Sequence, residues 1–198
     1  MQATTINKIP SKQKTPFYEK KWFYILLLIV LILSMVSFAL KQKTLKLLKE
    51  QQAGWGDITP GFTTIQDLER VSQFNNLIRS FETELGNVVV EFESDYPTKP
   101  SEVVFSPNGT VEKIVEQASV ENPEYINRYL EEYGEPNYSS LLSGNATETC
   151  SVYLLIGIAI VHNPEGLIFE KWYFQPTSLE LFLQEWGDLL SASGSGPE

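Results

Sequence analysis

The chain contains nineteen consecutive residues without a charge, WFYILLLIVLILSMVSFAL at 22–40, and this stretch most constrains how the chain folds. A helix needs about 20 apolar residues to cross the roughly 30 Å of hydrocarbon in a lipid bilayer. Aromatic and basic side chains, which favour the headgroup level, stand at its ends: Trp22, Phe23, Tyr24, Lys20, Lys21, Lys41 and Lys43. The pattern predicts a transmembrane helix over 22–40, with the lipid bilayer as a partner.

Two other interpretations of this stretch stay open at the level of sequence. Small residues at Ser37 and Ala39 suit a signal-peptide cleavage site, so a cleaved signal peptide is one alternative, and a buried core helix is the other. The stretch is longer than the roughly 7–15 residues of a signal-peptide apolar region. Buried helices of this length rarely lack polar residues. An uncleaved anchor is therefore the favoured interpretation.

Charge divides the chain into two parts. Residues 1–50 carry nine lysines and two glutamates, a net charge of +7, whereas residues 51–198 carry six basic and 23 acidic residues, a net charge of −17. Lysines lie on both sides of the apolar stretch, so the positive-inside rule alone does not orient it. The short basic tail and the long acidic remainder favour a cytoplasmic N-terminus and a C-terminal domain outside, at the plasma (inner) membrane.

These signals divide the chain into five segments. They are a cytoplasmic basic tail (1–21), the transmembrane helix (22–40), a basic juxtamembrane stalk (41–54), a folded domain (55–190) and a flexible tail (191–198). The stalk is rich in residues that favour helices. The domain is long enough to bury a hydrophobic core.

Short apolar runs and turn residues in the domain predict an α+β fold. Pro107-Asn108-Gly109, between β-branched runs, predicts a hairpin. The unbroken apolar run at 152–161 is predicted to be one strand buried on both faces, and further strands are expected at 87–93 and 167–174. We expect five or six antiparallel strands and three helices. The helices start near 64 (Thr63 or Thr64, with Gln66 or Asp67 in a capping box), span about 123–133, and run from Thr177 to Leu190.

One pattern in the domain resembles the small BamE/SmpA-like α+β domains. The residues that carry it are Trp55, Ile58, Pro60, Gly61, Thr63, Thr64, Leu68, Gly134 and Pro136. The resemblance implies a non-catalytic assembly or interaction module of a bacterial membrane protein, and it transfers no active-site residue. The Gly-x-Pro step follows the second helix instead of the first, and the lipid-bearing Cys of the family is missing. Two degenerate copies, 55–117 and 122–174, are one explanation and coincidence is the other.

The residues that could carry chemistry are few. A single Cys and a single His exclude a disulfide framework and any metal site built from several thiolates or imidazoles. Cys150 and His162 bracket the predicted strand at 152–161, which would hold them roughly 40 Å apart. The aromatic residues Trp172, Tyr173, Phe174 and Trp186 are expected to pack in the core, with glycan stacking as the alternative. We therefore predict no catalytic residue, no cofactor and no metal site.

The favoured function is that of a single-pass membrane protein that displays a non-catalytic extracytoplasmic interaction domain to a protein partner at the cell envelope. A net charge of −17 disfavours nucleic acid as a partner and favours cationic partners. A sensory or ligand-binding ectodomain is one alternative. A hydrolase that uses acidic residues on envelope polymers is the other.

Overall fold

The computed structural model describes residues 17–70, 76–94, 96 and 99–191. By its internal contacts the chain divides into two compact units, 1–47 and 48–198. We describe each unit by itself.

A single helix, α1 (Phe17–Gln51), contains the uncharged stretch. Its large apolar side chains from Trp22 to Phe38 are all 45–71% exposed. Within the described residues, no helix combines the length and the apolar character that crossing a membrane requires. The predicted transmembrane helix over 22–40 is therefore contradicted. The predicted cellular location stays a prediction.

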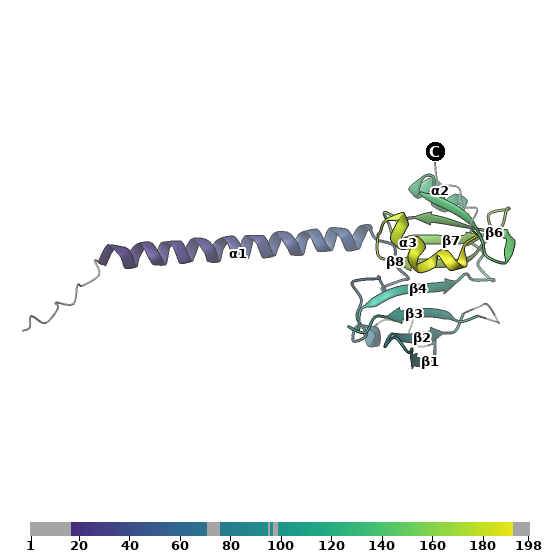
Figure 1. Ribbon diagram of the computed structural model, residues 1–198, viewed down its shortest axis with the longest axis horizontal. Helices are drawn as coiled ribbons and strands as arrows, with labels where there is room; N and C mark the ends of the chain where they lie inside the picture. Colours follow the sequence, from purple (N-terminus) through teal and green to yellow (C-terminus); the bar gives the residue numbers. More distant parts are fainter. Residues whose placement is uncertain (1–16, 71–75, 95, 97–98, 192–198) are drawn as a thin grey trace, which may run out of the picture. The chain divides into compact units, whose positions relative to one another are not determined.

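The second unit is built on one eight-stranded sheet in which every neighbouring pair is antiparallel (Figure 1). The strands are β1 (Leu77–Glu82), β2 (Val88–Phe92), β3 (Ser101–Phe105), β4 (Val111–Gln117), β5 (Tyr138–Leu142), β6 (Asn145–Tyr153), β7 (Ile158–His162) and β8 (Ile168–Phe174). Their order is β1-β2-β3-β4-β8-β7-β6-β5. The sheet thus consists of two four-stranded meanders whose last strands, β4 and β8, pair with each other.

In both meanders, the segment that precedes the first strand forms a backbone hydrogen bond with the turn before the last strand. In the first, the Ile65 N–H donates to the Gly109 carbonyl, 2.8 Å away, in the turn before β4. In the second, the Ile126 N–H donates to the Gly166 carbonyl, also 2.8 Å away, in the turn before β8. Both glycines have a positive φ (79° and 88°), which a residue with a side chain rarely adopts. A segment that precedes each meander is therefore attached to the last turn of that meander in the same way.

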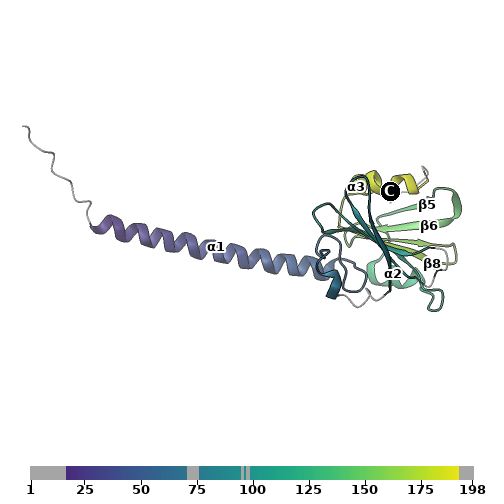
Figure 2. The same cartoon turned by 90° about the horizontal axis from the view of Figure 1, so that it is seen from below.

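Alternation along the strands gives the sheet two apolar faces with separate cores. The face under α2 (Asn127–Tyr133) includes Val103, Phe105, Ile114 and Ile160. The face under α3 (Leu179–Trp186) includes Cys150, Val152, Trp172 and Phe174. Figure 2 shows α2 and α3 on opposite sides of the sheet. Helices α2 and α3 thus cover the C-terminal meander, one on each side.

The predicted α+β class is wrong, because the sheet has more strands and the helices are shorter than we expected. The sequence patterns do not predict β1 and β5, which mix polar and apolar residues and lie at the two edges of the sheet. The helix predicted from near 64 is a three-residue 3-10 helix, η1 (Leu68–Arg70), and 71–75 lie outside the described residues. One half of the predicted capping box is present before it, since the backbone N–H of Thr64 donates to Asp67 Oδ2 at 3.0 Å.

The prediction of one strand over 152–161 is also wrong. The run folds into the β6–β7 hairpin, which turns through 154–157. Gly157 has a φ of 73°, and a Cβ at this position would lie 2.1 Å from the Phe174 carbonyl oxygen. Cys150 and His162 therefore lie on adjacent strands, paired with Val161 and Thr149 respectively, and are not 40 Å apart.

Other local predictions agree with the structure. The hairpin at Asn108-Gly109 is confirmed as the β3–β4 turn. The helix predicted at 123–133 starts later, at Asn127, but ends as expected where Gly134 takes a φ of 78°. The closing helix is confirmed as α3, followed by the 3-10 helix η3 (Gly187–Leu189), although its N-cap is Ser178 and not Thr177.

Candidate functional site

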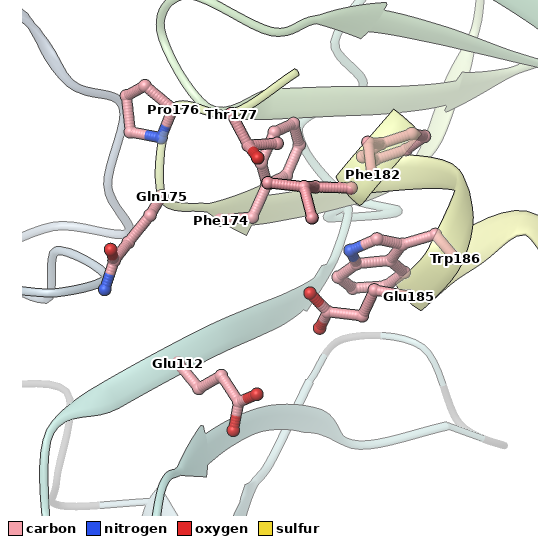
Figure 3. Close-up of a pocket in the computed structure, with 9 residues that line it drawn as sticks. Glu112, Phe174, Gln175, Pro176, Thr177, Phe182, Glu185 and Trp186 are labelled. Carbon is pink, nitrogen blue, oxygen red and sulfur yellow. The ribbon is translucent and has the colours of Figure 1, made fainter. Parts of the chain in front are cut away.

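A groove lies where α3 meets the ends of β4 and β8, with a cavity of about 440 Å³ (Figure 3). Its lining combines aromatic, proline and carboxylate side chains: Glu112, Phe174, Gln175, Pro176, Thr177, Leu181, Phe182, Glu185 and Trp186. We call this feature the α3 groove. Its volume is within the range of roughly 300–1,000 Å³ that is usual for ligand sites.

Two pairs of rings hold α3 on the sheet, and three of these four rings, Phe174, Phe182 and Trp186, line the groove. Trp186 stacks on Trp172 of β8 with ring centroids 4.8 Å apart and planes at 11°. Phe182 packs against Phe174 of β8 at 5.0 Å. Phe182 and Trp186 are four residues apart on the helix and therefore point the same way, as Trp172 and Phe174 do on the strand. The aromatic lining is rigid because every one of these rings is buried.

Two carboxylates and one ammonium group border the groove. Lys113 Nζ on β4 lies 3.3 Å from Glu185 Oε1 and 4.8 Å from the centroid of the Trp186 ring. Glu112 accepts a hydrogen bond at 3.3 Å from the side-chain amide of Asn87. Figure 3 shows the carboxylate of Glu185 between α3 and β4, and that of Glu112 on the other side of the β4 ribbon in this view. The border therefore attracts cations, and one cation of the chain already lies there.

The indole nitrogen of Trp186 is buried and has no hydrogen-bond partner within the described part of the chain. By contrast, the indole N–H of the stacked Trp172 donates to Glu170 Oε2 at 3.0 Å. A buried donor without an acceptor costs about 1–3 kcal/mol. Figure 3 places the Trp186 nitrogen on the edge of the ring that is turned toward Phe174. The groove thus contains a hydrogen-bond donor that lacks an acceptor.

A second polar cluster lies on the opposite face of the sheet, under α2. Lys171 Nζ is 3.1 Å from Glu116 and 3.2 Å from Glu124. The hydroxyl of Tyr173 donates to Glu116, and that of Tyr129 donates to Glu124 at 3.0 Å. Burial, together with the neighbouring carboxylates, raises the pKa of both tyrosines. Because these groups satisfy one another, the cluster joins β4, β8 and α2 and leaves little capacity for a ligand.

A serine–histidine pair also lies on adjacent strands. Ser151 Oγ is 3.0 Å from His162 Nε2, and His162 Nδ1 is 2.9 Å from the Asn163 carbonyl oxygen. A proton on Nδ1 would leave Nε2 free to accept the serine proton, which is the arrangement of a nucleophile and its base. Ser151 is only 5% exposed, however. Its burial limits access for a substrate, so this pair is a weaker candidate than the α3 groove.

The predicted anchor residues lie on α1. Trp22, Phe23, Tyr24 and Lys43 are exposed, and the side chains of Lys20, Lys21 and Lys41 lie outside the described part of the chain.

The residues of the family-like pattern have structural roles. Trp55 and Ile58 exchange backbone hydrogen bonds of 2.9 and 3.0 Å. Thr63 Oγ1 accepts from the Thr59 N–H at 2.8 Å. The Gly61 N–H donates to the Val111 carbonyl, and Thr64 forms the cap described above. Pro60 lies with them in this loop, whereas Gly134 and Pro136 lie in the connection between α2 and β5. The pattern and the predicted anchor contribute no residue to the lining of the α3 groove.

Sequence analysis did not find the groove, although it placed Trp186 and Phe174 in the core. Glu112 and Glu185 are far apart in the chain, and only the pairing of β4 with β8 brings them to one site. The local sequence hint of the groove is an exposed glutamate beside a core tryptophan at 185–186. This combination is common on amphipathic helices and therefore does not identify a site.

Comparison of the chain with protein-family models, with curated proteins and with solved structures finds no match. The resemblance to BamE/SmpA-like domains therefore stays a prediction.

Proposed function

We propose that this protein is a non-catalytic interaction protein whose β-sheet unit binds a basic segment of a partner protein in the α3 groove. The observation that carries the proposal is the groove itself, in which two carboxylates border an aromatic lining. Lys113 of the same chain lies against Glu185 and the Trp186 ring, so this surface already binds one cationic side chain.

The charge distribution supports a basic partner. Four of the six basic residues in 51–198 already form ion pairs within the unit: Arg79, Lys99, Lys113 and Lys171. Thirteen acidic residues of the same part of the chain are exposed: Asp57, Glu82, Glu84, Glu93, Glu112, Glu121, Glu131, Glu132, Glu135, Glu165, Glu180, Glu185 and Asp188. The resulting negative potential speeds encounter with cationic partners and weakens as salt is added.

We propose in addition that α1 associates with a lipid bilayer. Its apolar side chains from Trp22 to Phe38 are exposed all around the helix, and monomeric soluble proteins rarely expose so large an apolar surface. The full-length protein is expected to co-sediment with phosphatidylcholine vesicles at both low and high salt. A variant with Val30→Lys and Leu33→Lys should remain in the supernatant, and equal sedimentation of the two proteins would contradict the proposal.

The groove proposal is tested with two defined peptides and two matched variants of the full-length protein in a mild detergent. A lysine dodecapeptide should bind, and a glutamate dodecapeptide should not. The double variant Glu112→Gln/Glu185→Gln should weaken binding by at least about fivefold, since each contact to a charged group is worth about 1 kcal/mol or more.

The control variant is Glu131→Gln/Glu132→Gln, which removes the same charge from α2, on the other side of the sheet. Its affinity should change by less than about twofold, as expected for screened exposed charges. Equal losses in the two variants would show diffuse attraction in place of a site. Absence of any binding would contradict the proposed function.

A further inference from the structure

The α3 groove combines three features that suit one kind of ligand. They are the buried indole N–H of Trp186 that lacks an acceptor, the pair of carboxylates at Glu112 and Glu185, and the wall formed by Pro176 and the aromatic rings. We infer that the groove recognises an extended peptide segment in which an arginine lies beside a proline, with a main-chain carbonyl bound to Trp186. This inference rests on the proposed function and narrows its ligand.

The unpaired donor sets the first requirement. The ring of Trp186 is 3% exposed, so its N–H loses water without gaining an acceptor from the chain. A ligand that brings a carbonyl oxygen recovers the hydrogen bond. Main-chain carbonyls of proline-rich segments are well suited, because such segments are already extended and lose little entropy on binding to aromatic grooves. The indole nitrogen itself has almost no exposed surface, so binding of the carbonyl requires a side chain of the groove wall, such as the 57% exposed Leu181, to move aside.

The carboxylates set the second requirement. Lys113 already lies against Glu185, whereas Glu112 accepts a hydrogen bond from the neutral amide of Asn87. A planar guanidinium group pairs with carboxylates through two parallel hydrogen bonds and is more weakly hydrated than an ammonium group. Arginine is therefore favoured over lysine in a site that includes Glu112 and is partly closed by aromatic side chains.

The experiment uses full-length protein labelled with ¹⁵N and the peptide acetyl-Ala-Pro-Arg-Pro-Ala-amide. The chain has four tryptophans, so its spectrum should contain four indole N–H signals, and Trp186→Phe identifies the signal of Trp186. We expect the peptide to shift that signal and to leave the signals of Trp22 and Trp55 in place. The same peptide with citrulline for arginine should bind at least about fivefold more weakly, because it keeps the shape and loses the charge.

The Trp186→Phe variant provides a second readout. It keeps an aromatic ring on Trp172 and removes the unpaired donor, but the smaller ring also gives up buried contacts, so affinity is measured on the folded variant. Peptide affinity should fall by at least about threefold, the value of one modest hydrogen bond. A folded variant that binds the peptide as tightly as the unchanged protein would overturn the inference.

The outcomes separate this inference from the proposed function. If the lysine dodecapeptide binds and depends on Glu112 and Glu185, but the arginine peptide leaves the Trp186 signal unmoved, the inference is wrong and the proposed function stands. The same conclusion follows if the citrulline peptide binds as tightly as the arginine peptide. If neither basic peptide binds, both proposals fail.

Discussion

Lys171 Nζ lies 3.1 Å from Glu116 Oε1 across the β4–β8 pair that joins the two meanders. The side chain of Lys171 is only 7% exposed, and that of Glu116 is 17% exposed. The lysine also contacts Glu124, which precedes α2. One buried ammonium group therefore connects both meanders and the segment before α2.

Replacement of Lys171 by methionine is expected to lower the free energy of unfolding by about 3 kcal/mol. The change keeps most of the side-chain volume but leaves two carboxylates without their cation, and breaking a buried ion pair typically costs about 3–5 kcal/mol. We take the lower end because Glu124 is 35% exposed. Urea unfolding of the full-length chain measures the difference.

Lys113→Met is the control for this prediction. Lys113 is 30% exposed and its partner Glu185 is 38% exposed, so the loss should stay under about 1 kcal/mol. An equal or larger loss for Lys113→Met would show that the buried cluster is not what holds the two meanders together.

Gly157→Ala is expected to destabilise the protein by at least about 3 kcal/mol. The residue has a φ of 73°, and its new Cβ would lie 2.1 Å from a backbone oxygen, which no side-chain rotation relieves. Gly144→Ala is the matched control, because Gly144 has a φ of 80° but open space around it. That substitution should lower the free energy of unfolding by only about 1–2 kcal/mol, which is the cost of a left-handed backbone conformation for a residue with a Cβ. Thermal unfolding of the two variants separates steric from conformational cost.

The ion pair between Arg79 and Glu91 is expected to stabilise the fold at neutral pH and to lose this effect at low pH, where Glu91 is protonated. Its hydrogen bonds, of 2.7 and 2.8 Å, hold the pKa of Glu91 below its usual value. A lowered folded-state pKa contributes stability that is present above the unfolded-state value, about 4.3, and is lost as the pH falls through the folded-state value. Glu91→Gln should therefore be less stable than the unchanged protein at pH 7 and equally stable near pH 2. A difference that persists at low pH would point to a cause other than charge.

Cys150 is expected to be inert to thiol reagents in the folded protein. Its side chain is fully buried, and burial raises the pKa of the thiol to about 12. Both effects suppress the reactive thiolate. Maleimide labelling at pH 7.5 should therefore require denaturant. The positive control is Leu155→Cys in a Cys150→Ser background, since position 155 is 82% exposed. Fast labelling of the native unchanged protein would contradict the burial of Cys150.

Signals that act within a few residues were read correctly from sequence. Asn108-Gly109 forms the predicted hairpin, and Gly134 ends α2, because a glycine with positive φ determines a turn whatever surrounds it. The cap of Thr64 on Asp67 is local for the same reason. The positions of β2, β8 and α3 followed from strand and helix patterns that match the faces they bury.

Features that depend on pairing between distant segments could not be predicted from the sequence. The run at 152–161 has the composition of one buried strand, and only the close approach of the Phe174 backbone to Gly157 shows why it turns there. The edge strands β1 and β5 lack a strong apolar pattern, and β1 is exposed along its whole length, so pairing with a neighbour defines them. The uncharged stretch was read as a transmembrane helix, a prediction that the described residues of α1 contradict.

Composition by itself established that residues 51–198 are strongly acidic and that thiol and imidazole chemistry is limited to one residue of each type. Tertiary structure decided where that charge acts. Pairing of β4 with β8, and packing of Trp186 on Trp172, bring Glu112 and Glu185 to the lining of one groove and leave an indole N–H without an acceptor. The physical reason is that charge and residue type are properties of the chain, whereas burial and unmet hydrogen bonds arise only when remote segments exclude water from one another.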